Sequence, residues 1–166
     1  IVLGRAFRAW CTPEIGRDDT GAGSAPQSPY HGSAHTCYLH YVAAYSDLVV
    51  EHFQNPRNAG EMPDPDGEAT KSNPVCGDRM RVMIRVDDGH IAEVRWQTRG
   101  CPPAIATSSV ASEMVVGWDL ERVEALTREV IAEAVGGLPS DKVHCSVLAA
   151  DALRGAIADY RAKHTA

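Results

Sequence analysis

The sequence predicts an α+β domain in which a small antiparallel sheet is covered on one face by α-helices. An alternating apolar pattern runs through residues 79–98 and is interrupted by a strong turn signal, Asp88-Gly89. Apolar residues at helical spacing dominate after Cys101. A short amphipathic segment precedes the strands, so the order is helix, strands and then helices, which is typical of α+β proteins.

The first predicted element is a short helix in the stretch YSDLVVEHFQNPRN. Ser46 is a suitable N-cap residue, and Asn55-Pro56 is a stop signal. A loop follows, with one edge strand expected near Ala69–Ser72.

The next two strands form a predicted hairpin. In RMRVMIRVDDGHIAEVRWQT, Met80, Val82, Ile84 and Val86 share one face, and the arginines between them share the other. The apolar phase changes around Ala92, which suggests a β-bulge.

Helices are predicted for the remainder of the chain. Two prolines after Cys101 place this cysteine at or before a helix N-cap, and Gly117 ends that helix. Residues 119–137 give one or two short helices closed by glycines. The last helix follows Pro139.

Two unequal parts are expected along the 166 residues. Residues 1–44 are rich in Gly, Ser, Ala and Pro and predict a disordered or loosely attached N-terminal extension, and residues 45–166 predict the folded domain. The extension contains His31, His35 and His40 with Cys37, which could bind a metal adventitiously, but no helix signal frames them.

Composition and charge restrict the function. The net charge of −6 argues against nucleic acid as a partner, and no apolar stretch reaches the roughly 18 residues that span a membrane. Five cysteines are scattered along the chain, and its first residues lack a signal-peptide pattern. These features predict a cytoplasmic protein with free thiols.

Three cysteines occupy similar places at the ends of predicted elements: Cys76 before a strand, Cys101 before a helix and Cys145 at a helix start. Free backbone amides and the helix dipole stabilise thiolates at such places. Gly77 and Gly100 remove side-chain bulk beside two of the sulfurs, which leaves room for a bulky inorganic ligand.

Asp78 and His144 add a carboxylate and an imidazole to this group. The inventory suits zinc, ferrous iron or an iron–sulfur cluster. Each residue also has an ordinary interpretation, since a single cysteine is most often a small buried apolar residue, Asp78 could be a turn residue and His144 a hydrogen-bonding group at a helix start. The spacing matches no local metal-binding knuckle, so the residues alone leave these alternatives open.

Four stretches, YSDLVVEHFQNPRNAG, NPVCGDRM, TRGCPPAIATSS and LPSDKVHCSVLAADALRGAIADY, closely resemble the IscU/NifU family of iron–sulfur cluster assembly scaffolds. The resemblance runs from Tyr45 to Lys163. It implies three antiparallel strands packed against several helices. It also implies a non-enzymatic scaffold that receives sulfur from a cysteine desulfurase, assembles a [2Fe–2S] cluster and passes it to apo-proteins.

The resemblance assigns roles residue by residue. Cys76, Cys101 and Cys145 match the cluster cysteines, and Asp78 matches the aspartate that makes the cluster labile. His144 matches the histidine beside the third cysteine and is an optional fourth ligand. Cys145 is the candidate persulfide acceptor, and the metal-free site is expected to take zinc.

Further partners implied by the resemblance are Hsp70/J-protein chaperones, a ferredoxin or frataxin-like protein and a second copy of the chain. The sequence departs from the family in two places. GCPPAIA replaces the common GCGSAIA, and LPSDK replaces the chaperone-recognised LPPVK, which puts chaperone handling in doubt.

Three other functions compete with the scaffold. The first is a zinc-bound sulfur acceptor, a SufU-like sulfurtransferase that works with a cysteine desulfurase. The second is a hydrolase with Cys145 as nucleophile and His144 as base, although adjacent residues at a helix start rarely point at each other. The third is a purely structural zinc domain.

Overall fold

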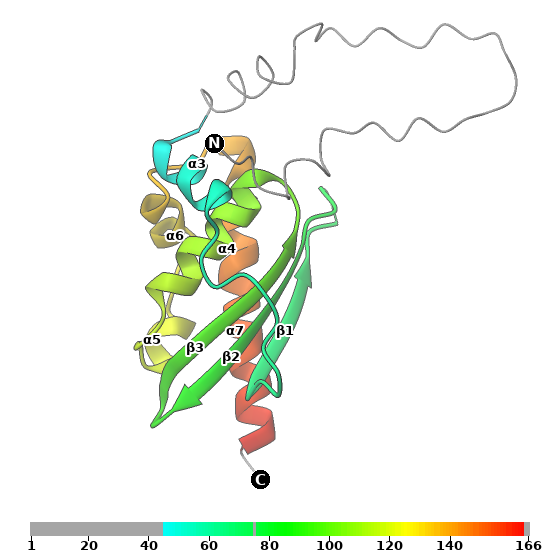
Figure 1. Ribbon diagram of the computed structural model, residues 1–166, viewed down its shortest axis with the longest axis vertical. Helices are drawn as coiled ribbons and strands as arrows, with labels where there is room; N and C mark the ends of the chain where they lie inside the picture. The colour runs from blue at the N-terminus through cyan, green and yellow to red at the C-terminus, as the bar shows by residue number, and fades with distance from the viewer. Residues whose placement is uncertain (1–44, 75, 165–166) are drawn as a thin grey trace, which may run out of the picture. The chain divides into compact units, whose positions relative to one another are not determined.

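The computed structural model describes residues 45–74 and 76–164, which belong to one compact unit, Tyr45–Ala166. The predictions for residues 1–44, including a metal-binding role for His31, His35, Cys37 and His40, lie outside the described residues. Within the unit, one helix precedes three strands and further helices follow, so the predicted α+β order is confirmed (Figure 1).

Helix α3 (Asp47–Gln54) begins and ends where its sequence signals predict. The Ser46 hydroxyl accepts a hydrogen bond from the backbone N–H of Val49 at 3.2 Å, which satisfies one of the free amides of the first turn. The C-cap is Asn55, the residue before Pro56.

The sheet contains β1 (Gly67–Ser72), β2 (Arg79–Asp87) and β3 (His90–Arg99), in the order β1-β2-β3 with antiparallel pairing. The predicted edge strand therefore starts two residues earlier than expected. The hairpin turn has positive φ at Asp88 and Gly89, as a type I′ turn requires. The predicted bulge is confirmed, because Arg85 pairs with Glu93 but Val86 pairs with Ile91, which leaves Ala92 as the extra residue.

Helix α4 (Pro102–Met114) follows β3 directly and has Cys101 as its N-cap residue, as predicted. Two short helices, α5 (Leu120–Glu124) and α6 (Arg128–Ala134), and a 3₁₀ turn, η1 (Ser140–Lys142), lead to the long helix α7 (His144–His164). Within the described residues, no helix combines the length and apolar character needed to cross a membrane.

The core lies between the sheet and helices α4 and α7 (Figure 1). Met80, Val82 and Ile84 point into it from β2 and are at most 3% exposed. The opposite face is not fully open. Residues 55–66 run from the free edge of β3, where Ala59 bridges Trp96, to the start of β1, and Met83 on β2 is 0% exposed.

The antiparallel order of the strands brings three segments to one end of the unit. β1 ends, β2 begins and β3 ends there, because the sheet is antiparallel. Helix α4 starts directly after β3, and α7 packs beside α4 with its first residues at the same end. We call this region, formed by residues 73, 74, 76–78, 99–101 and 143–145, the site end.

Candidate metal centre

Residues 73, 74 and 76–78 lie between β1 and β2 and include Cys76 and Asp78. Two backbone hydrogen bonds close this loop: Gly77 N–H donates to Asn73 O at 2.9 Å, and Asn73 N–H donates to Asp78 O at 2.8 Å. The loop directs the two side chains differently, since Cys76 is exposed and Asp78 is only 5% exposed.

The prediction that Gly77 and Gly100 leave room for a ligand beside the sulfur atoms stays a prediction, and the structure shows a further reason for each glycine. A Cβ on Gly77 would meet no atom within 4 Å, and its φ of +75° is what favours glycine. At Gly100 a Cβ would lie 2.8 Å from Cγ and Oδ1 of Asp78. Gly100 therefore makes room for the buried carboxylate.

Cys101 contacts both the Asp78 carboxylate and the Cys145 sulfur. Its backbone N–H donates to Asp78 Oδ1 at 3.3 Å, and its Sγ lies 3.6 Å from Asp78 Oδ2. The same sulfur lies 3.6 Å from Cys145 Sγ. Cys101 is half-buried at the start of α4, whereas Cys145, in the first turn of α7, is 0% exposed.

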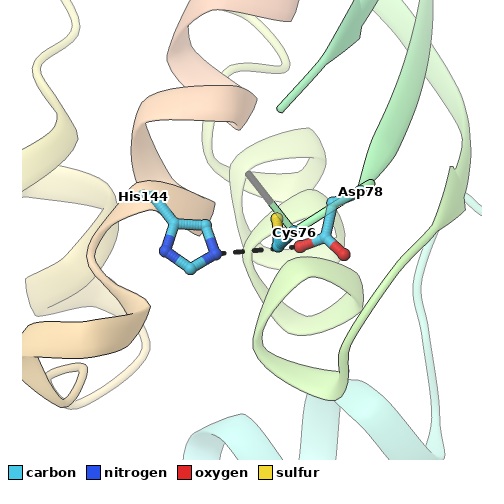
Figure 2. A group of neighbouring side chains, drawn as sticks. All are labelled: Cys76, Asp78 and His144. Carbon is cyan, nitrogen blue, oxygen red and sulfur yellow. Dashed lines mark ion pairs between the residues drawn. The ribbon is translucent and has the colours of Figure 1, made fainter. Parts of the chain in front are cut away.

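His144 completes the group from the start of α7 (Figure 2). Its Nε2 lies 3.9 Å from Asp78 Oδ2, and Figure 2 shows the ring turned toward the carboxylate beside Cys76. This nitrogen is buried and has no hydrogen-bond partner among the described residues. A buried polar atom without a partner is costly, which is expected of a group prepared for a ligand.

The structure brings all five predicted site residues together. Their ligand atoms form two groups with internal separations within 4.8 Å: Cys76, Asp78 and His144 in one, and Asp78, Cys101 and Cys145 in the other. Asp78 belongs to both. Cys11 and Cys37 lie outside the described residues.

Hydrogen bonding shifts the pKa values of the Cys101 and Cys145 thiols in opposite directions. The pKa of Cys101 is lowered, chiefly by its hydrogen bond with the Cys145 thiol. The pKa of Cys145 is raised far above its usual range by that same bond and by burial. Partial desolvation of its sulfur, aided by the Asp78 charge, raises the pKa of the exposed Cys76. Ligand thiols must lose protons to bind metal, so a metal ion bound at this site would release protons.

The geometry does not favour the hydrolase alternative. The His144 ring faces Asp78, and the Cys145 sulfur faces Cys101, so the two sequence neighbours have different partners. A nucleophile and its base must lie within hydrogen-bond reach of each other.

One residue that supports the site, Thr107, was not identified from the sequence. Thr107 is 0% exposed on α4, and its Oγ1 donates to Ala104 O at 3.1 Å and to Cys145 O at 3.4 Å. It thereby ties the middle of α4 to the first turn of α7 and helps fix Cys145. The available signal was the polar run Thr-Ser-Ser in the middle of a helix whose first five residues are apolar.

Comparison with known proteins identifies the family of this chain. Residues 44–166 match the model of the family described as NifU-like N terminal domain. Iron-sulfur cluster assembly scaffold protein IscU 1 of Archaeoglobus fulgidus is 56% identical over 120 residues, which cover 72% of this chain and 78% of the relative. Iron-sulfur cluster assembly scaffold protein IscU of Escherichia coli K12 is 44% identical over 127 residues, which cover 74% of this chain and 98% of the relative.

A solved structure shares the fold. The crystal structure of a nitrogen-fixing NifU-like protein (N-terminal) from Brucella abortus aligns with a TM-score of 0.59 at 21% identity, covering 72% of this chain and 96% of the other. The predicted three-stranded sheet packed against several helices is therefore confirmed. From the family match and the identity to its relatives, this chain belongs to the NifU-like N-terminal domain family.

Proposed function

We propose that this chain is a scaffold that assembles a labile [2Fe–2S] cluster from iron and desulfurase-derived sulfur and passes it to apo-proteins. The observation that carries the proposal is the pair of ligand groups that share Asp78. Two adjacent groups of donors suit a cargo that contains two metal ions better than a single structural ion. The named activity of the relatives supports the same conclusion.

Three thiolates and one weaker donor would hold the cluster. Cys76, Cys101 and Cys145 supply the soft sulfur ligands that iron–sulfur clusters require. The remaining iron position would fall to Asp78 or to His144. A carboxylate oxygen is a harder ligand than a thiolate, so exchange at that corner is easier, as transfer demands.

A zinc-bound sulfur acceptor is the second candidate. The group of Asp78, Cys101 and Cys145, with His144 or Cys76 nearby, offers the sulfur, nitrogen and oxygen donors of a tetrahedral zinc site. We infer that zinc occupies the site when iron and sulfide are absent. In the scaffold, zinc would be displaced during assembly, whereas in a sulfurtransferase it would stay bound during turnover.

The scaffold would not turn over a small-molecule substrate. Its partners would be a cysteine desulfurase as sulfur source and apo iron–sulfur proteins as recipients, with Hsp70/J-protein chaperones, a ferredoxin or frataxin-like protein and a second copy of the chain as further candidates. We also infer a reducing, cytoplasmic setting, since the three described cysteines are free thiols. Residues 1–44 would be a loosely attached extension that the scaffold does not need.

Anaerobic reconstitution tests the function. The metal-free chain is incubated with ferrous iron, cysteine and a catalytic amount of cysteine desulfurase, and visible absorption is followed by iron and sulfide analysis. Charge-transfer bands with equal iron and sulfide, lost in Cys76→Ser, Cys101→Ser and Cys145→Ser, are the expected result. A colourless protein that keeps one zinc ion and only accelerates the desulfurase would favour the second candidate.

A further inference from the structure

Two arginines at the site end face each other without a counter-charge. Arg79, the first residue of β2, pairs directly with Arg99, the last residue of β3. Residues directly opposite in an antiparallel pair have Cβ atoms about 4.5–5.5 Å apart, and like charges at such positions destabilise the sheet. Both side chains are exposed, and among the described residues no ion pair, hydrogen bond or ring contact involves either guanidinium group. We call these two residues the arginine pair.

The arginine pair stands on the face of the sheet that points away from the helices. Met80, the neighbour of Arg79, is 0% exposed in the core. Thr98, the neighbour of Arg99, has its hydroxyl oxygen 2.7 Å from that of Ser108 on α4. Successive side chains of a strand point to opposite faces, so both arginines belong to the outer face.

Elsewhere on this face, arginines have acidic partners. Arg81 Nη2 lies 2.6 Å from Glu68 Oε2, and Arg95 Nε lies 2.8 Å from Glu93 Oε1. The chain contains 22 acidic residues and has a net charge of −6, so counter-charges are abundant. The arginine pair is therefore a local positive surface on an acidic chain.

This surface borders the metal centre. Arg79 directly follows Asp78, and Arg99 lies two positions before Cys101. Any protein that exchanges cargo with the metal centre must approach the same end of the sheet. We propose that the arginine pair is a docking point for recipient apo-proteins that present a carboxylate-rich surface. The inference rests on the proposed function, because it concerns the proteins that receive the cluster.

The chemistry of the arginine pair indicates the class of partner. A guanidinium group forms two parallel hydrogen bonds with a carboxylate, and two unpaired groups side by side suit a surface with several carboxylates. A small anion fits less well, because small-molecule sites are clefts or cavities and these side chains stand exposed on a sheet face. Nucleic acid would be repelled by the net charge of −6.

Charge at the metal centre favours a recipient over the sulfur donor. Thiol ligands lose their protons when they bind metal. Three thiolates and the Asp78 carboxylate carry more negative charge than a [2Fe–2S] core carries positive charge, so the loaded site repels an acidic surface more strongly than the empty site does. The arginine pair offsets this repulsion for the protein that approaches the loaded site.

A binding measurement tests the inference without a cluster. The reduced, metal-free full chain is titrated anaerobically at low ionic strength into a fluorescently labelled apo-ferredoxin of net negative charge, and fluorescence anisotropy is followed. Arg79→Gln/Arg99→Gln should weaken binding about three- to tenfold. Its affinity should also depend less on salt than that of the unsubstituted chain, because screening acts on the charges that the variant lacks.

A matched control removes the same charge elsewhere. Arg85→Gln/Arg128→Gln changes an exposed arginine of the same sheet face, whose guanidinium donates to Pro63 O, and one on α6 that pairs with Glu129. This control should bind the recipient as the unsubstituted chain does. The urea midpoint of Arg79→Gln/Arg99→Gln should stay unchanged or rise, since repulsion between like charges is relieved. A lower midpoint would indicate a structural role for the arginine pair and contradict the inference.

Cluster transfer distinguishes the recipient from the sulfur donor. Transfer from reconstituted Arg79→Gln/Arg99→Gln to the same apo-ferredoxin should be slower at low ionic strength and approach the rate of the unsubstituted chain at high ionic strength. Cluster assembly driven by the cysteine desulfurase should keep its rate. Slower assembly with unchanged transfer would assign the surface to the sulfur donor and overturn the inference.

Further outcomes would also overturn it. Equal binding of the recipient by Arg79→Gln/Arg99→Gln and the unsubstituted chain is one, and an equal loss in the matched control is another. Saturable competition by inorganic phosphate at constant ionic strength would indicate a small-anion site, and retardation of duplex DNA that requires the arginine pair would indicate nucleic acid. Cluster assembly from iron and inorganic sulfide on the unsubstituted chain involves no protein partner, so its failure would instead count against the proposed function.

Discussion

The two ends of the sheet differ in how their polar groups are paired. At the β2–β3 turn, backbone groups pair with one another: Ile91 N–H donates to Trp118 O, and Gly117 N–H donates to Ile91 O. At the site end, the Asp78 carboxylate has only long contacts, and His144 Nε2 has no hydrogen-bond partner among the described residues. The turn end uses its polar groups to hold the fold, whereas the site end keeps donors available for a ligand.

This contrast predicts that core substitutions damage the fold and that substitutions at the site end damage binding. The largest effect on folding should come from Ile84→Ala, because Ile84 is 0% exposed between the sheet and the helices. The loss should be about 2–5 kcal/mol. Urea denaturation of the metal-free protein measures it. Val130→Ala, at a position 41% exposed on α6, should change stability by less than about 0.5 kcal/mol. Equal losses in both variants would contradict the assigned core.

Gly100→Ala should distinguish an effect on metal binding from an effect on folding stability. A Cβ at this position would collide with the Asp78 carboxylate and displace it, so affinity for zinc or ferrous iron should fall about 10- to 100-fold. Chelator competition measures the affinity. Gly117→Ala is the matched control, since Gly117 has φ of +81° and open space around its Cβ position. That control should lose about 1 kcal/mol of stability and bind metal normally. Unchanged affinity in Gly100→Ala would show that the carboxylate position does not matter.

Asp78→Ala should make the cluster more persistent. Removing the harder oxygen donor closes the exchange route at the weak corner, so the half-life of the cluster in air should lengthen about severalfold. Decay of visible absorption measures it. Asp78→Asn keeps an oxygen that can accept from Cys101 N–H and should lie between the wild type and Asp78→Ala. An equal or shorter half-life for Asp78→Ala would contradict the labilising role.

The smallest expected effect is the dependence of folding stability on pH. Burial lowers the pKa of His52, whose Nδ1 lies 2.9 Å from Ser109 Oγ, and the Arg57 charge adds to the shift. The unfolded chain therefore binds the proton more readily. Stability should fall as pH drops from about 6.5 through the lower folded pKa. His52→Gln should flatten the dependence of the urea midpoint on pH in metal-free protein. An unchanged slope would mean that other groups control it.

Much of this fold could be predicted because its signals are local. The Ser46 cap, the Asp88-Gly89 turn and the bulge at Ala92 each depend on a few neighbouring residues. The five site residues could be grouped as candidate metal ligands as well, although the residues alone left their ordinary interpretations open.

Other features depend on contacts between distant segments. The packing of Asp78 against Gly100 depends on the register of β2 and β3 and on where α4 begins. The burial of Cys145 beneath Cys101 depends on how α7 docks against α4. Neither has a periodic pattern in the sequence, and the complete burial of Met83 on the opposite face of the sheet has none either.

Cluster transfer tests the central claim most directly. The reconstituted chain is mixed anaerobically with an apo-ferredoxin in the presence of an iron chelator, and circular dichroism of the acceptor is followed. If the site end holds a cargo, the cluster should reach the acceptor intact and more slowly from Asp78→Ala than from the wild type. A cluster that stays on the chain, or iron that reaches the chelator first, would contradict the account.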